Sequence, residues 1–206
     1  MPTLCPTRVS RFKNFGNFNK GFTPLGSRAL KSLFLGTSAL DGEYLYGLTK
    51  RCAEVAQAES SAFLEPRYSV YGNNPTGWRA LAKWVRKWKV DETTTTLLAV
   101  QLPRVYPVWK KLGMVQSFGE MLRNFFDPLF AAARHNAENP IQDPDAITDD
   151  VAWLLPRLRL LDTVDDESKP DLFEVGGLPP PDDWTGPDNP SWAYYHFHSE
   201  SFFPFI

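Results

Sequence analysis

The stretch TGWRALAKWVRKWKV, residues 76–90, carries the sharpest structural pattern in the chain. On a helical wheel of about 100° per residue its large apolar side chains fall within one arc: Trp78, Leu81, Trp84, Val85 and Trp88. Its cations fall on the opposite arc, with no acidic residue among them: Arg79, Lys83, Arg86 and Lys87. This pattern predicts an amphipathic helix that follows the Asn-Asn-Pro turn at 73–75 and has Thr76 as its N-cap.

Several interpretations of this helix are open. In the simplest, it is a surface helix whose tryptophans pack into the core and whose cations are solvated. In a second, the cationic face binds the phosphates of a nucleic acid. An amphipathic helix of this kind also suits a membrane surface or a groove on a partner protein.

Similar patterns elsewhere predict a mainly α fold, with five or six helices in a single body and extended arms at both termini. Besides 76–90, helices are expected at 27–35, 39–64, 92–101 and 118–135, and from Thr148 onward. Ser117 and Glu120 form a capping box before the fourth of these. Within 92–101 four threonines favour a strand, but the acidic pair and the apolar run favour a helix, which we expect. Residues 67–71 are expected to be extended, and Cys52 lies on the apolar stripe expected in the core.

Charge is distributed unevenly, although the formal net charge is only −2. Residues 1–40 hold six cations and no acid, whereas residues 138–206 hold three cations and 15 acids. Prolines also concentrate toward the C-terminus. The sequence therefore predicts a basic aromatic arm at 1–26, an α-helical body at 27–162, and an acidic, proline-rich arm at 163–206 that ends in an aromatic anchor.

This layout is typical of a structural subunit that associates with nucleic acid, as a coat or nucleocapsid protein does. The residues expected to bind the phosphate backbone, without reading its sequence, are cations: Arg8, Arg11, Lys13, Lys20, Arg28, Lys31, Arg79, Lys83, Arg86 and Lys87. The residues expected to join one copy to the next are the aromatic side chains near the C-terminus: Trp192, Tyr194, Tyr195, Phe197, Phe202, Phe203 and Phe205. The expected partners are other copies of the chain and a nucleic acid, with RNA favoured.

A second hypothesis is a non-enzymatic interaction protein, of the viral accessory type, that binds a host protein through its aromatic termini. An enzyme with an unmarked cleft is a third. No phosphate-binding loop or nucleophile elbow is present. His196 and His198 lack the two further ligands that zinc needs. The adjacent carboxylates at 149–150 and 165–167 fit solvation or helix capping as well as catalysis. We therefore expect no enzyme, catalytic residue, metal or cofactor.

Cysteine usage and hydropathy bear on location. Cys5 and Cys52 form no CxxC pair, which favours a reducing compartment. The sequence contains no run of 18 apolar residues, so no transmembrane helix is expected. The first 30 residues lack the continuous apolar segment of a secretory signal. The expected location is the cytoplasm or a virus-like particle, and secretion is not expected.

Overall fold

The computed structural model describes residues 40–59, 65–92, 98–140, 143–166, 171 and 177–200. The chain divides into two compact units, residues 1–45 with 166–170, and residues 46–165 with 171–206. In the first unit the described part is a turn at 40–42, the first residues of helix α3 (Glu43–Ala58), and Asp166. The predicted arm at 1–26 and the predicted helix at 27–35 lie outside the described residues.

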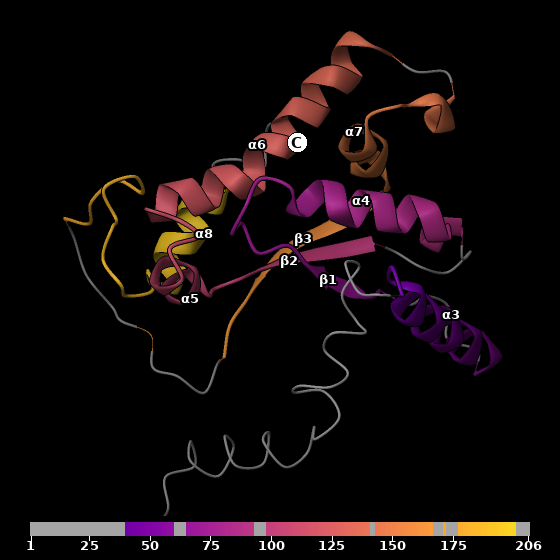
Figure 1. Ribbon diagram of the computed structural model, residues 1–206, viewed down its shortest axis with the longest axis horizontal. Coiled ribbons are helices and arrows are strands. Elements are labelled where there is room, and N and C mark those ends of the chain that lie inside the picture. The colour runs from indigo at the N-terminus through magenta and orange to yellow at the C-terminus, as the bar shows by residue number, and fades with distance from the viewer. Residues whose placement is uncertain are drawn as a thin grey trace, which may run out of the picture. The chain divides into compact units, whose positions relative to one another are not determined.

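The second unit is built on a three-stranded parallel sheet with the order β1 (Arg67–Ser69), β2 (Leu98–Pro103) and β3 (Leu158–Val164), shown in Figure 1. Parallel neighbours need a crossover connection, and helices supply both of them here. The described part of the chain is therefore mixed α/β. The mainly α prediction is confirmed only in part, because the described residues form six α-helices together with a parallel sheet that was not expected from the sequence.

The first crossover contains α4 (Gly77–Trp88) and the short 3-10 helix η1 (Val90–Glu92). The second contains α5 (Tyr106–Lys111), α6 (Phe118–Glu138), η2 (Pro144–Ala146), α7 (Asp150–Leu154) and η3 (Leu155–Arg157). Helix α8 (Trp192–Glu200) follows β3. Helices α4, α6 and α7 pack against one another and lie on the same side of the sheet in Figure 1.

The amphipathic helix predicted at 76–90 is confirmed as α4, and Trp78 and Trp84 on its apolar face enter the core. Trp78 is fully buried, donates its indole N–H to the carbonyl of Phe125 at 2.6 Å, and meets the Phe125 ring edge-on. Trp84 is also buried, and Trp88 stacks on Tyr46. The structure therefore agrees with the simplest interpretation of this face, in which tryptophans of the helix pack into the core.

The ends of α4 and α6 test the capping predictions. Thr76 occupies the N-cap position of α4 but makes no side-chain cap bond; Asn74 Oδ1 instead accepts from its backbone N at 2.9 Å. At α6 the Ser117 hydroxyl accepts from the backbone N of Glu120 at 3.1 Å, as a capping box predicts. The Glu120 carboxylate reaches back to the backbone N of Gln116, one residue earlier than the motif prescribes.

Three other predictions are corrected by the structure. Residues 98–101 belong to β2 and not to a helix. The prediction failed because a strand buried on both faces reads as a largely apolar run, and periodicity does not distinguish such a run from a buried helix. The helix expected from Thr148, with Pro156 kinking or splitting it, is indeed interrupted there, since α7 ends at Leu154 and Pro156 lies in η3, but the residues that follow form β3 from Leu158 and not a second helix. Cys52 is exposed on α3, so its predicted place in the core is also wrong.

Candidate functional site

In parallel sheets with helical crossovers, substrates bind at the carboxyl ends of the strands. Here Arg104 directly follows β2, and Asp165 directly follows β3. The backbone N of Arg104 donates to the carbonyl of Val164 at 2.8 Å, which extends the pairing of the two strands by one step. The sheet register therefore brings a cation and a carboxylate together from distant parts of the sequence.

The Arg104 guanidinium is buried, with only 3% of the side chain exposed. Its Nη1 lies 3.1 Å from Asp165 Oδ2, and its Nη2 lies 3.0 Å from Asp171 Oδ1. Nη2 also donates to the carbonyl of Pro190 at 2.6 Å, whereas the Nε–H has no hydrogen-bond partner. A buried arginine is tolerated only when it is paired in this way. With two carboxylates around one cation, the formal charge of the group is −1.

Two aromatic rings complete this site. The guanidinium carbon lies 4.4 Å from the centroid of the Trp192 ring and 5.1 Å from that of Tyr195. Such cation–π contacts stabilise a desolvated arginine. We refer to these residues as the Arg104 cluster: Arg104, Asp165, Asp171, Trp192 and Tyr195.

Hydrogen bonds tie the segment after β3 to this end of the sheet. The Asn189 amide donates to the carbonyl of Arg104 at 2.8 Å and accepts from the Tyr195 hydroxyl at 2.9 Å. The backbone N of Trp192 donates to Asp171 Oδ2 at 2.9 Å. Burial raises the pKa of Tyr195, against the opposing effect of the Arg104 charge, so its hydroxyl stays a proton donor at neutral pH. These hydrogen bonds therefore hold the segment after β3 against the carboxyl end of the sheet.

A loop at 181–184 docks on the first turn of α6 beside the cluster. The backbone N of Phe118 donates to the carbonyl of Trp184 at 3.0 Å, and that of Gly119 donates to the carbonyl of Pro181 at 2.7 Å. A Cβ atom at Gly119 would lie 2.8 Å from the backbone N of Asp182, so a glycine is needed for this close approach. The Tyr106 hydroxyl also donates to the carbonyl of Trp184, at 3.0 Å.

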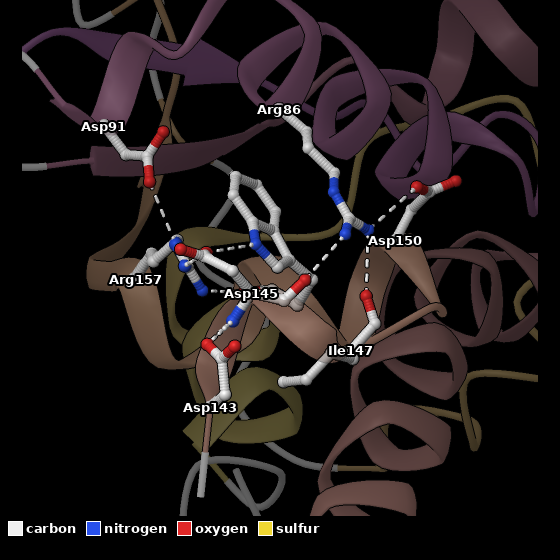
Figure 2. A network of polar contacts seen from close by, with 8 residues as sticks. Arg86, Asp91, Asp143, Asp145, Ile147, Asp150 and Arg157 are labelled. Carbon is white, nitrogen blue, oxygen red and sulfur yellow. Dashed lines mark hydrogen bonds and ion pairs between the residues drawn. The ribbon is translucent and has the colours of Figure 1, made fainter. Parts of the chain in front are cut away.

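A second arginine network lies at the opposite, amino end of the strands and is drawn in Figure 2. Arg157 directly precedes β3; its Nε lies 2.9 Å from Asp91 Oδ2, and its Nη2 lies 2.6 Å from Asp145 Oδ1. Its Nη1 donates to the carbonyl of Trp153 at 2.8 Å, and its guanidinium carbon lies 4.0 Å from the centroid of the Trp153 ring. We refer to these residues as the Arg157 cluster: Arg157, Asp91, Asp145 and Trp153.

The cations predicted to bind phosphate fall into three groups. Three on α4 are exposed: Arg79, Lys83 and Lys87. Arg86 instead donates to the carbonyls of Ile147 and Asp145, at 2.9 and 3.1 Å, beside the Arg157 cluster (Figure 2). The others lie outside the described residues: Arg8, Arg11, Lys13, Lys20, Arg28 and Lys31. Among the described residues, three of the four predicted cations therefore share the exposed face of α4, and the fourth is engaged within the chain.

The predicted aromatic anchor packs partly within the chain itself. Tyr195 is buried, and the Phe118 ring of α6 lies 4.5 Å from its centroid and 5.7 Å from that of Tyr194. Phe197 is 71% exposed. The remaining aromatic residues lie outside the described part of the chain: Phe202, Phe203 and Phe205. Tyr194 and Tyr195 are therefore engaged within the chain itself.

Arg104 and Asp171 were not predicted as site residues, and Asp165 was one of several carboxylates whose role stayed open. A charged residue at the end of an apolar run, as in LAVQLPR, is a pattern that marks the carboxyl end of a buried strand, but it is useful only once the strand is identified. Asp149 proves to be the N-cap of α7, accepting from Val151 and Ala152. Helix capping, which the sequence analysis weighed against solvation and catalysis, is therefore the role of Asp149.

The residues that the structure describes show neither a metal-binding cluster nor a candidate membrane span. Across the described ranges no group of three or more His, Cys, Asp or Glu side chains is placed to hold a metal ion. That finding leaves the expectation of no metal or cofactor untested. None of the described helices combines the length and the apolar character needed to cross a membrane.

Comparison with known proteins places the chain in an enzyme family. A family model described as AMP deaminase matches residues 6–202. The chain is 36% identical over 190 residues to an AMP deaminase of Saccharomyces cerevisiae, covering 91% of this chain and 22% of that protein. It is 33% identical over 189 residues to AMP deaminase 3 of Rattus norvegicus, covering 91% of this chain and 23% of that protein. The chain thus spans less than a quarter of the length of these relatives.

These matches overturn the predicted function. The coat or nucleocapsid interpretation, the viral accessory alternative and the prediction of no enzyme are all wrong, because the matching family and relatives are named as enzymes. Nucleic acid and further copies, as the partners that followed from those interpretations, are withdrawn with them. The predicted location stays a prediction. Because the family model covers most of its residues, the chain belongs to the AMP deaminase family.

Proposed function

We propose that this chain takes part in the hydrolytic deamination of AMP and that the carboxyl end of its sheet forms part of the substrate site. The family match over residues 6–202 carries the proposal. The location is supported by the Arg104 cluster, which lies where parallel sheets with helical crossovers bind their substrates.

The reaction consumes one water molecule. Water adds to C6 of the adenine ring, the bond from C6 to the exocyclic nitrogen breaks, and that nitrogen leaves as ammonia. The product is inosine monophosphate, which has a carbonyl group at C6. The water must be activated by a metal ion or a general base. The described residues offer no ligand set for a metal ion, so no step is derived through one. The role of the described residues is binding and positioning.

The test measures AMP binding and turnover by the purified chain. Calorimetric titration follows binding, and ammonia release follows turnover. We expect saturable AMP binding that is weakened by Asp165→Asn and unchanged by Lys87→Met, which alters an exposed cation in the last turn of α4, toward the amino end of the sheet. Guanosine monophosphate, which carries no amino group at C6, is the control ligand. A folded chain that neither binds nor deaminates AMP would contradict the proposal.

A further inference from the structure

We propose that residues 180–188 form a flap that covers the carboxyl end of the sheet in an autoinhibited state and must move away from α6 before a nucleotide binds there. This inference rests on the proposed function and adds a means of regulating that same site. The segment lies beside the start of α6 and beside α8 in Figure 1. We refer to residues 180–188 as the flap.

The two ends of the flap are fixed by neighbouring residues of α8. The Tyr194 hydroxyl donates to the carbonyl of Pro179, just before the flap. The Tyr195 hydroxyl donates to Asn189 Oδ1 at 2.9 Å, just after it. The Asn189 amide in turn donates to the carbonyl of Arg104. A short loop whose two ends are held in this way is able to pivot on them while the rest of the chain stays in place.

Hydrogen bonds within the flap allow it to move as one piece. The backbone N atoms of Asp183 and Trp184 donate to the carbonyl of Pro180, at 2.9 and 3.1 Å. The Trp184 indole N–H donates to the carbonyl of Asp188 at 3.0 Å, which ties the middle of the flap to its end. These bonds require no partner outside the flap, so they persist when it is displaced.

Three hydrogen bonds from α5 and α6 hold the flap in its closed position. The Trp184 carbonyl accepts from the Tyr106 hydroxyl and from the backbone N of Phe118, both at 3.0 Å. The Pro181 carbonyl accepts from the backbone N of Gly119 at 2.7 Å. Opening the flap breaks these bonds and leaves both amides of α6 to solvent.

The remaining contacts of the flap lie largely at the surface. Arg123 Nη1 lies 2.5 Å from Asp182 Oδ1, but 49% and 62% of these two side chains are exposed, and such pairs add little stability. The Trp184 ring is half-buried, 5.1 Å from the ring of Tyr194. Other residues of the flap are exposed: Asp183, Thr185, Gly186, Pro187 and Asp188. Segments held by few buried contacts open locally while the rest of the fold persists.

Charge makes closure of the flap and binding of a nucleotide oppose each other. Asp182, Asp183 and Asp188 give the flap a formal charge of −3, since it contains no lysine or arginine. The phosphate of AMP is dianionic, and like charges repel. The flap is anchored next to Arg104, which directly follows β2, so its closed position lies at the end of the sheet that we assign to the substrate. AMP therefore binds the open form more tightly.

Under this scheme the affinity for AMP depends on the fraction of the chain whose flap is open. A ligand that binds only the open form loses affinity in proportion to the closed population. A substitution that weakens the closed position should therefore tighten AMP binding. A loop with a purely structural role would not respond in this direction.

The decisive experiment compares Tyr106→Phe with Tyr68→Phe by calorimetric titration with AMP. The first removes the hydroxyl that bonds to the Trp184 carbonyl, and the second removes a hydroxyl of β1 that lies 3.5 Å from Thr49 Oγ1. Neither changes the charge. We expect AMP to bind about fivefold more tightly to Tyr106→Phe, and within about twofold of wild type to Tyr68→Phe. Unchanged or weaker binding in Tyr106→Phe would overturn the inference.

A second pair of variants separates docking of the flap from its charge. Asp182→Asn and Asp188→Asn each remove one negative charge, but Asp182 pairs with Arg123 of α6, whereas Asp188 is exposed near the other end of the flap. We expect Asp182→Asn to bind AMP about twofold more tightly than Asp188→Asn does. Equal affinities would contradict the inference, because charge alone would then account for the change.

Amide hydrogen exchange follows the opening itself and carries the test if Tyr106→Phe does not fold. In the wild-type chain, AMP should accelerate exchange at Phe118 and Gly119, whose amides bond to the flap, and leave Phe125 and Phe126 unchanged deeper in α6. Slower exchange at Phe118 and Gly119 would overturn the inference, since the flap would then close over the bound nucleotide. Exchange that AMP does not alter would overturn it as well.

Failure of the proposed function has a different signature. If neither the wild-type chain nor Tyr106→Phe binds AMP, the proposed function is contradicted and this inference with it. If the wild-type chain binds AMP and Tyr106→Phe shows no gain in affinity, the inference alone is overturned.

Discussion

The Arg104 cluster and the Arg157 cluster have nearly the same composition and stand at opposite ends of one sheet. In each, an arginine pairs with two aspartates and lies against a tryptophan. They differ in what they join. Arg157 joins parts of the two crossovers that precede the strands, whereas Arg104 joins the ends of two strands to a segment that follows the sheet. The difference teaches that composition alone does not single out a candidate site, and that position relative to strand direction is what favours the Arg104 cluster as one.

The largest expected effect is on stability, and it differs between the two clusters because Arg104 is more deeply buried than Arg157. Arg104→Met leaves two carboxylates without their buried cation, and we expect a loss of about 3–5 kcal/mol in the free energy of unfolding. The Arg157 side chain is 18% exposed and Asp145 is largely solvated, so Arg157→Met should cost only about 1–3 kcal/mol. Urea unfolding measures both. A larger loss for Arg157→Met would reverse the order of the two clusters.

The next effect concerns the loop beside the Arg104 cluster. Gly119→Ala places a Cβ against the backbone of Asp182, so the loop at 181–184 must move, and we expect about 1–3 kcal/mol of destabilisation. Amide hydrogen exchange at Phe118 and Gly119 should accelerate as their bonds to the loop loosen.

The control for this substitution is Gly47→Ala. Nothing lies within 4 Å of a Cβ at that position in α3, and alanine is favoured in a helix by about 0.5–1 kcal/mol. The control should therefore be neutral or stabilising. If both alanines destabilise alike, the close approach at Gly119 is not the cause.

High pH should affect the carboxyl end of the sheet through Tyr194, in α8. Burial, with a smaller effect of the Asp183 charge, raises the pKa of Tyr194 to about 12 from 10.0. Because the folded pKa is raised, the associated stability is present below pH 10 and is lost as the pH rises from 10 toward 12. Unfolding at a series of pH values should show a steeper loss in wild type than in Tyr194→Phe. Parallel curves would contradict this prediction.

The smallest effect tests which residue caps α4. Asn74→Ala removes the oxygen that accepts from Thr76, and we expect a loss of about 1 kcal/mol. Thr76→Ala leaves that acceptor in place and should change the stability by no more than about 0.5 kcal/mol. Thermal unfolding of the two variants distinguishes them, and the reverse order would restore Thr76 as the functional cap.

Local features were predictable where one segment determines them. The helix at 77–88 and the Ser117 cap depend on side chains within a turn or two, and both were read correctly. Strands β2 and β3 were missed because their apolar runs fit either a strand or a helix, and only pairing with a distant strand decides between them. Arg104 and Asp165 meet solely through that pairing, so no spacing in the sequence pointed to the site.

The functional prediction failed because it inferred a nucleic-acid partner from the distribution of basic and acidic residues along the sequence. Arg86 was counted as a phosphate ligand, yet its guanidinium is occupied by the carbonyls of Asp145 and Ile147. Tyr195 was counted as an anchor for another copy, yet it packs on Phe118 of the same chain. The distribution of charge along a sequence does not show which charged side chains are paired within the folded chain. Tertiary contacts decide which of them remain exposed to a partner.

The attachment of Asp171, Pro190 and Trp192 to Arg104 also sets an order for folding during synthesis. Strands β2 and β3 leave the ribosome before the segment that supplies Asp171, Pro190 and Trp192. Until that segment arrives, the guanidinium at the end of β2 must stay hydrated, and the adjoining edge of the sheet stays open to water. Completion of the carboxyl end is thus a late step in folding, and a translational pause before residue 171 would prolong the interval in which this edge is unprotected.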